Sequence, residues 1–108
     1  DQTAALNYYL KALDIFKHLN QPDKIASVES NIGIIYQNQG NIKEAQSYYQ
    51  KALKIGKKIN DKQIISTAVN NLGDISVGRK EYIKALHYFM QSLYLNKKNN
   101  DDFGVAMS

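Results

Sequence analysis

Residues 31–55, with the sequence NIGIIYQNQGNIKEAQSYYQKALKI, form two amphipathic halves joined by a short polar break. In the first half, Ile32, Ile35 and Tyr36 recur at the i, i+3, i+4 spacing of a single helix face. A similar period runs through the apolar and small residues of the second half, Ala45, Tyr48, Tyr49, Ala52, Leu53 and Ile55. The alternation of a β-strand is absent, so both halves are predicted to be helices.

The break between the two halves has the chemistry of a helix end followed by a helix start. Gly40 can adopt the left-handed conformation that ends a helix, and Asn41 with Glu44 forms a candidate capping box for the next one. The small residues Gly33 and Ala45 occupy positions where two helix backbones could approach closely. The stretch therefore predicts an antiparallel helical hairpin.

Copies of this hairpin recur along the chain. Ala5, Ala45 and Ala85 are evenly spaced (45 − 5 = 40 and 85 − 45 = 40), and Gly33 is related to Gly73 by the same step. Further positions related by this step are Tyr8, Tyr48 and Tyr88; Ala12, Ala52 and Ser92; Leu13, Leu53 and Leu93; and Asn20, Asn60 and Asn100. The chain is therefore predicted to be an all-α repeat array.

The repeat period divides the chain into a single array with two full repeats. The predicted helices cover residues 2–19, 22–39, 42–59, 62–78 and 81–99. The predicted units are the second helix of a truncated repeat at 1–20, full repeats at 21–60 and 61–100, and the start of a further helix at 101–108. An array that starts and stops within repeats is expected to be a piece of a longer protein.

The residues of the hairpin resemble a tetratricopeptide repeat (TPR). The run Asn-Ile-Gly-x-x-Tyr at 31–36 and the run Tyr-Tyr-Gln-Lys-Ala-Leu at 48–53 carry the likeness, and Asn-Leu-Gly at 71–73 begins a second copy. This resemblance implies antiparallel helical hairpins stacked as a right-handed superhelix. The usual repeat has about 34 residues, and the longer step of this chain resembles the repeats of bacterial sensor and regulator proteins and of spindle-orientation adaptors.

The sequence departs from the TPR pattern at several positions. Glu29 and Val69 stand where the family commonly has a tryptophan. In the last copy, Lys80 replaces Gly40, and Gly78 lies two residues earlier. The turn before the last helix is therefore predicted to differ from the turn at Gly40.

Composition and spacing exclude several functional classes. The chain has no cysteine, no apolar run near the ~20 residues of a membrane span, and no signal peptide. Its two histidines, His18 and His87, occupy different repeat registers, and its carboxylates do not recur in pairs suited to general acid–base chemistry. The sequence predicts no enzyme, no cofactor and no metal site, and it leaves the cellular compartment open.

The formal net charge of +4 raises the question of an anionic partner. Lysines recur near the ends of the second helices, at Lys57, Lys58, Lys97 and Lys98. Such a stripe could attract phosphate or an acidic protein surface, but cations at helix C-termini also offset the helix dipole. The tyrosine period assigns Tyr9 and Tyr49 to the core and Tyr8, Tyr48 and Tyr88 to its border. No nucleic-acid partner and no membrane partner are predicted.

The resemblance implies that the first helix of each hairpin lines a concave binding surface. Residues left on that face after the packing positions are removed are Ser27, Ser30, Asn31, Ile34 and Asn38, with Thr67, Asn70, Asn71, Asp74 and Gly78 in the next repeat. The candidate peptide-binding residues among them are Asn31, Ile34, Asn38, Asn70, Asn71 and Asp74. In the long-repeat adaptors, the asparagine matching Asn31 and Asn71 contacts the backbone of an extended peptide. The basic clamp of the chaperone-tail binders is absent at Ile34 and Asp74.

Three functions remain open. The chain could be a scaffold that binds a protein or peptide segment in the groove, a sensory or regulatory segment of a bacterial signalling protein such as a histidine kinase or transcription regulator, or a structural spacer. The helices at both ends lack a packing partner, so the sequence also predicts self-association through these uncapped ends.

Overall fold

The computed structural model describes the backbone of residues 1–107 and the side chains of residues 1–97. It contains the helices α1 (Gln2–His18), α2 (Pro22–Asn38), α3 (Ile42–Ile59), α4 (Lys62–Gly78) and α5 (Tyr82–Met107), and no strand occurs within residues 1–107. The all-α prediction is confirmed. The predicted bounds of the first four helices agree with the observed bounds to within one residue.

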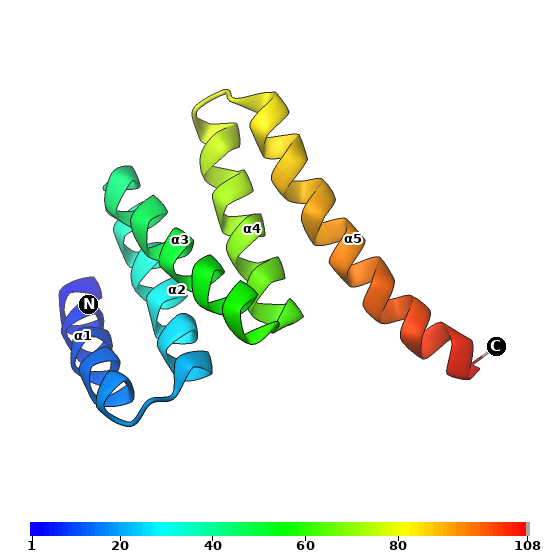
Figure 1. Cartoon of the computed structure of the whole chain (residues 1–108). Helices are drawn as coiled ribbons and strands as arrows, with labels where there is room; N and C mark the ends of the chain where they lie inside the picture. The colour runs from blue at the N-terminus through cyan, green and yellow to red at the C-terminus, as the bar shows by residue number, and fades with distance from the viewer. Residues whose placement is uncertain (108) are drawn as a thin grey trace.

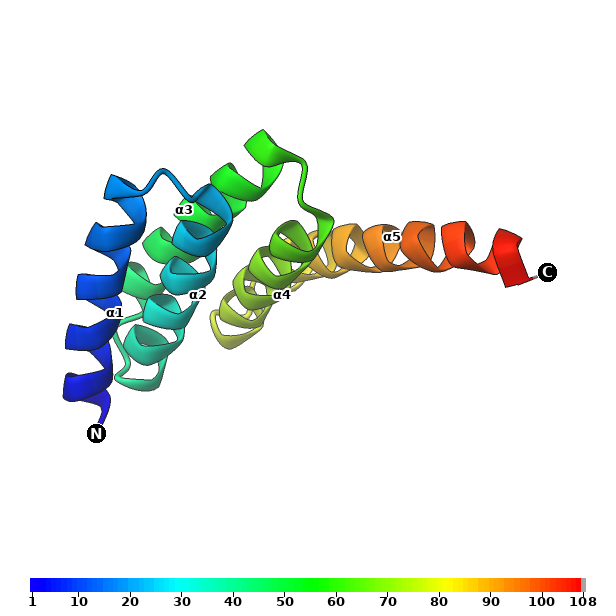
Figure 2. The same ribbon diagram turned by 90° about the horizontal axis from the view of Figure 1, so that it is seen from below.

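Consecutive helices pack against each other, and α2 also packs against α4 (Figure 1). The first helices α2 and α4 therefore lie side by side, and α3 connects them. The view in Figure 2 shows α5 running away from the other helices toward its C-terminal end. Among the described helices, α5 packs only against α4.

The core consists of small residues on one helix facing large residues on the next. A Cβ atom added to Gly33 on α2 would lie 2.6 Å from the ring of Tyr49 on α3, and a Cβ added to Gly73 on α4 would lie 2.6 Å from the ring of Phe89 on α5. Such distances are too short for any real side chain, so only glycine permits these approaches. Tyr49 is fully buried as a result.

Two groups of apolar side chains surround these contacts. Leu13, Val28 and Ile32 form the first, between α1 and α2. The second lies between α3 and α4 and consists of Ala45, Tyr49, Leu72 and Ile75. The predicted packing positions are therefore in the core.

The tyrosines at the border of the core differ from one another. The rings of Tyr36 and Tyr48 stack, with their centroids 5.8 Å apart. Tyr9 is only partly buried, although it was predicted to lie in the core. Tyr8, predicted at the border, is 73% exposed, because no helix in the structure packs against that side of α1.

The turns that end α1, α2, α3 and α4 share one backbone conformation. Gly40 has a φ of 82°, and the left-handed region is also occupied by Asn20, Asn60 and Lys80, with φ values of 52°, 56° and 61°. The prediction of a different turn at Lys80 is wrong. The hairpin geometry requires a positive φ at this position, so Lys80 adopts the conformation that glycine adopts at Gly40.

The N-terminal caps are only partly as predicted. Asn41 occupies the N-cap position of α3, but its side chain makes no capping hydrogen bond, so the capping box with Glu44 is absent. At the start of α4, the Asp61 carboxylate accepts a hydrogen bond of 3.1 Å from the backbone N–H of Ile64. Asp61 has the extended backbone that aims a cap inward, with ψ at 105°, whereas the ψ of Asn41 is 73°.

The joint predicted near Asn100 is not present, because α5 continues as one helix from Tyr82 to Met107. Each earlier joint is followed by a helix of at least 17 residues that packs against its predecessor. Continuing the helix through Asn100 keeps the intrahelical backbone hydrogen bonds that a turn would break.

Candidate functional site: the groove between α2 and α4

A hollow of about 210 Å³ lies between the N-terminal halves of α2 and α4. Its lining consists of Ala26, Ser27, Ser30 and Asn31 from α2 and Gln63, Ile64 and Thr67 from α4. Hydroxyl and amide side chains make up most of this lining, and none of it is charged. Four of these residues, Ser27, Ser30, Asn31 and Thr67, were predicted to lie on the groove face.

Only one of the six candidate peptide-binding residues lines this hollow. Asn31 does so, with its side chain exposed. Further along the same helices, Asn38, Asn70 and Asp74 are exposed, and Ile34 is 42% exposed. These residues are accessible to a partner, but they form a row along the two helices and not a single cavity.

Asn71 differs from its repeat equivalent Asn31. It is partly buried, and its side-chain nitrogen is buried without a hydrogen-bond partner in the chain. A buried donor without a partner costs about 1–3 kcal/mol. Supplying an acceptor to Asn71 would therefore be favourable, provided that its side chain turned toward the groove.

A hydrogen bond from the core holds a side chain in the last turn of α2 in place. The Tyr49 hydroxyl donates to Oε1 of Gln37 over 2.7 Å. Burial, together with the nearby carboxylate of Asp74, raises the pKa of Tyr49 to about 12. The hydroxyl therefore stays protonated at neutral pH and remains a donor to Gln37, with Asp74 close by.

Gln37 was not among the predicted site residues, although the sequence carries a signal for it. One repeat later, Val77 replaces Gln37 (77 − 37 = 40) and Phe89 replaces Tyr49 (89 − 49 = 40). A polar pair in one repeat is thus exchanged for an apolar pair in the next. A paired exchange at one spacing indicates contact between the two positions, and the structure contains that contact.

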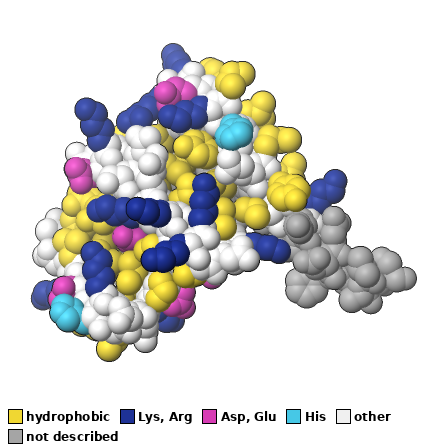
Figure 3. Space-filling model, viewed as in Figure 1, with side chains coloured by type: hydrophobic (Ala, Val, Ile, Leu, Met, Phe, Trp, Pro, Cys, Tyr) yellow, Lys and Arg dark blue, Asp and Glu magenta, His cyan; other side chains and the backbone are white. Residues whose placement is uncertain are grey.

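Charge is distributed unevenly between the two kinds of helix. The first helices α2 and α4 carry Lys24 and Lys62 against Asp23, Glu29 and Asp74. In contrast, α3 carries five lysines and one glutamate. Figure 3 shows lysine side chains spread over the viewed face. The groove therefore has no basic clamp, and the positive charge lies on the second helices.

The predicted lysine edge is accessible where the structure describes it. Lys57 and Lys58 are exposed in the last turn of α3, whereas Lys97 is exposed within α5, ten residues before its end at Met107 (107 − 97 = 10). Lys98 lies outside the residues whose side chains are described.

The described residues contain no group of three or more His, Cys, Asp or Glu side chains arranged to hold a metal ion. Within the same part of the chain, no helix combines the length and apolar character needed to cross a membrane.

Comparison with known proteins places this geometry in a family. No match was found among curated proteins. The tetratricopeptide repeat family matches residues 24–98, a span that begins in the first turn of α2 and ends within α5. Repeats of this family are non-catalytic and mediate protein–protein interactions. Because the match covers well over half of the sequence, the chain belongs to the tetratricopeptide repeat family.

Proposed function

We propose that this chain binds an extended segment of a partner protein along the groove lined by α2 and α4. The observation that carries the proposal is the uncharged polar hollow between the two first helices, with Asn31 at its edge. Interaction with proteins is the general role of the family, and the hydroxyl and amide side chains of the groove suit it to bind a peptide backbone.

The chemistry of the groove matches a peptide backbone. An asparagine amide offers both a donor and an acceptor, so it can pair with the N–H and the C=O of an extended chain. Asn31 and Asn71 stand one repeat apart, and the hydroxyls of Ser27 and Thr67 add further polar contacts. Each neutral hydrogen bond contributes about 0.5–1.5 kcal/mol, so two repeats bind weakly and further repeats would add affinity.

Charge in the groove favours a basic ligand residue. Asp74 is exposed on α4 and lies near the Tyr49 hydroxyl, which holds the side chain of Gln37 by a hydrogen bond. A lysine or arginine of the ligand could pair with Asp74 while Gln37 accepts or donates a hydrogen bond. A terminal carboxylate would find no cation in this part of the groove.

A second candidate is a sensory or regulatory segment of a bacterial signalling protein. It is favoured by the step between the starts of α2 and α4, which is longer than the usual repeat (62 − 22 = 40). A kinase or DNA-binding domain in the same reading frame would support this role. If the reading frame encodes only further repeats, the scaffold role is favoured instead.

The groove is tested by removing the two repeat-related amides. Partners captured from lysate by the chain are quantified by mass spectrometry, then compared with those captured by the double variant Asn31→Ala, Asn71→Ala. We expect recovery to fall about 5- to 150-fold, the equivalent of two lost hydrogen-bonding positions.

The matched control is Gln50→Ala on the exposed side of α3, which should leave recovery unchanged. Circular dichroism establishes that all variants keep their helicity. Undiminished recovery by the double variant would show that another surface binds the partner.

A further inference from the structure

Helix α5 carries a row of large, exposed apolar side chains beside its contact with α4. Ile83, Met90 and Tyr94 form this outer stripe, and they are 83%, 55% and 63% exposed. Their i, i+7, i+11 spacing places them on one face of the helix. The contact with α4 is made from another face, by Phe89. Three large apolar side chains are thus presented together to solvent.

The repeat register distinguishes the outer stripe from an uncapped end of the array. The equivalent residues of α3 are Lys43, Gln50 and Lys54, each 40 positions earlier (83 − 43 = 40). All three are exposed even though α4 packs against α3. A following helix that packed on α5 as α4 packs on α3 would therefore leave the outer stripe exposed. Stacking of repeats does not explain why these positions are apolar in α5 and polar in α3.

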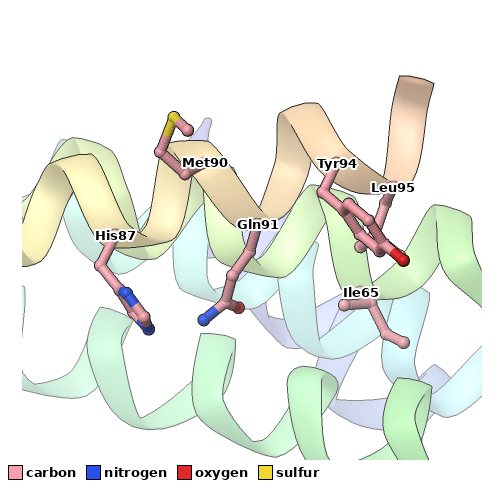
Figure 4. A pocket seen from close by; sticks show the side chains of 6 residues that line it. All are labelled: Ile65, His87, Met90, Gln91, Tyr94 and Leu95. Atoms are coloured by element: carbon pink, nitrogen blue, oxygen red, sulfur yellow. The ribbon is translucent and has the colours of Figure 1, made fainter. Parts of the chain in front are cut away.

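A hollow of about 380 Å³ adjoins the stripe. Its lining is mainly apolar and consists of Ile65 from α4 and His87, Met90, Gln91, Tyr94 and Leu95 from α5. Figure 4 shows Met90 on the opposite side of the α5 ribbon from His87 and Gln91. Met90 and Tyr94 thus belong both to the outer stripe and to the rim of the hollow. A cavity of this size can accept large apolar side chains of a partner.

The surroundings of this surface are basic. In the described part of α5, Lys84 and Lys97 are present and no acidic residue occurs. Two copies of this surface would repel each other, whereas a partner with acidic residues beside its apolar ones would be attracted.

We propose that the outer stripe and its hollow bind an amphipathic helix of an acidic partner protein. Large apolar side chains of that helix enter the hollow, and its Asp and Glu residues face Lys84 and Lys97 of α5. The stripe spans 12 residues (94 − 83 + 1 = 12), about 16 Å or three helical turns from end to end, which suits a short helix lying along α5. A bilayer surface is a poorer fit, because a flat interface cannot fill a hollow.

The test uses the chain's own repeat register to build the variant. In the stripe variant, Ile83→Lys, Met90→Gln and Tyr94→Lys are combined, so that α5 carries the residues of α3 at the same positions. All three sites are exposed, and the changes add positive charge. A loss of binding to an acidic peptide would therefore be due to the lost apolar surface and not to charge.

Displayed helical peptides of 18 residues are selected against the chain and measured by fluorescence anisotropy. We expect enriched peptides to have apolar residues at i, i+3 or i+4 and i+7 with an excess of Asp and Glu. Their affinity for the stripe variant should fall about tenfold or more. The groove variant Asn31→Ala, Asn71→Ala should bind them as the parent chain does, which separates this surface from the proposed peptide groove.

Several results would overturn the proposal. These are the absence of any enriched peptide, enrichment without acidic residues, and equal affinity for the parent chain and the stripe variant. A dimer seen by sedimentation velocity and abolished in the stripe variant would assign the surface to a second copy. Flotation with phosphatidylserine vesicles that depends on the stripe, without peptide binding, would assign it to a membrane.

Discussion

At the scale of single residues, the fold depends on pairs in which a small side chain admits a large one. Gly33 admits the ring of Tyr49, and Gly73 admits the ring of Phe89 in the same way. These two contacts repeat because both members of each pair repeat. Glu29 is also buried in the core, but it is not repeated, since the equivalent residue of the next repeat is Val69.

Glu29 places a carboxyl group where the next repeat has an apolar side chain. It is only 4% exposed, and its Oε1 atom has no hydrogen-bond partner in the chain. Burial raises the pKa of Glu29 above 4.5, and the attraction of Lys51 and Lys17 offsets this only in part. The charged form is therefore destabilised in the folded chain relative to the unfolded chain.

We predict that Glu29→Val raises the free energy of unfolding at pH 7 by about 1–3 kcal/mol, since it removes a buried polar group without a partner. Because the folded-state pKa is raised, protonation stabilises the folded parent chain as the pH falls. The difference in the free energy of unfolding between the variant and the parent chain should therefore narrow as the pH falls toward 4.5. Urea unfolding at several pH values measures this difference.

The matched control for this series is Glu44→Val, which removes an exposed carboxylate. Its effect should show no comparable narrowing at low pH. A Glu29→Val variant that is less stable than the parent at pH 7 would contradict the prediction, and it would mean that the attraction of Lys51 and Lys17 outweighs burial.

At the scale of secondary-structure elements, the helices end where a residue with positive φ permits the turn. Glycine does this after α2, and a lysine does it after α4. The two turns are otherwise equivalent. The Asn41 N–H donates to the carbonyl of Tyr36, the Glu81 N–H donates to the carbonyl of Ser76, and both bonds are 2.8 Å long. The left-handed conformation costs a residue with a Cβ about 1–2 kcal/mol, and Lys80 bears this cost.

We predict that Lys80→Gly stabilises the chain by about 1 kcal/mol, because glycine adopts the left-handed conformation without a steric penalty. The reciprocal change, Gly40→Lys, should destabilise the chain by a similar amount. Both effects appear as shifts in the urea midpoint with an unchanged slope. Destabilisation by Lys80→Gly would show that the Lys80 side chain contributes more than the turn strain costs.

At the scale of the whole molecule, α1 and α5 each pack against a single helix among the described residues. On α5, Tyr82 and Leu93 are 62% and 58% exposed, whereas the equivalent Ile42 and Leu53 of α3 are partly buried against the core between α3 and α4. The end face of α5, defined by Tyr82 and Leu93, differs from the outer stripe. It is the face that a following first helix would cover.

We predict that the chain associates as its concentration rises, because these end faces lower their free energy when apolar surface is removed from water. Sedimentation velocity over a range of concentrations measures the association. Tyr82→Gln with Leu93→Gln should reduce it, whereas the stripe variant should not. A monomer at every concentration would exclude the end faces as self-association sites.

The sequence by itself determined the first four helices, the positions of the four turns between helices and the residues that pair across each hairpin. These features depend on spacing within a few residues and on a repeat whose copies match, and both are visible in the chain. Gly33, Gly40 and Ala45 could be assigned in this way. The residues of the groove face could be predicted for the same reason, although the structure does not bring them together into one site.

Only the tertiary structure decided which side chains from distant helices share an environment. It placed the Tyr49 hydroxyl on Gln37 near Asp74, left Glu29 buried without a partner for one oxygen, and formed the hollow between Ile65 and α5. It also continued α5 beyond the predicted joint at Asn100. Helix formation depends on local hydrogen bonds, whereas burial, cavities and pKa values depend on the relative placement of several helices.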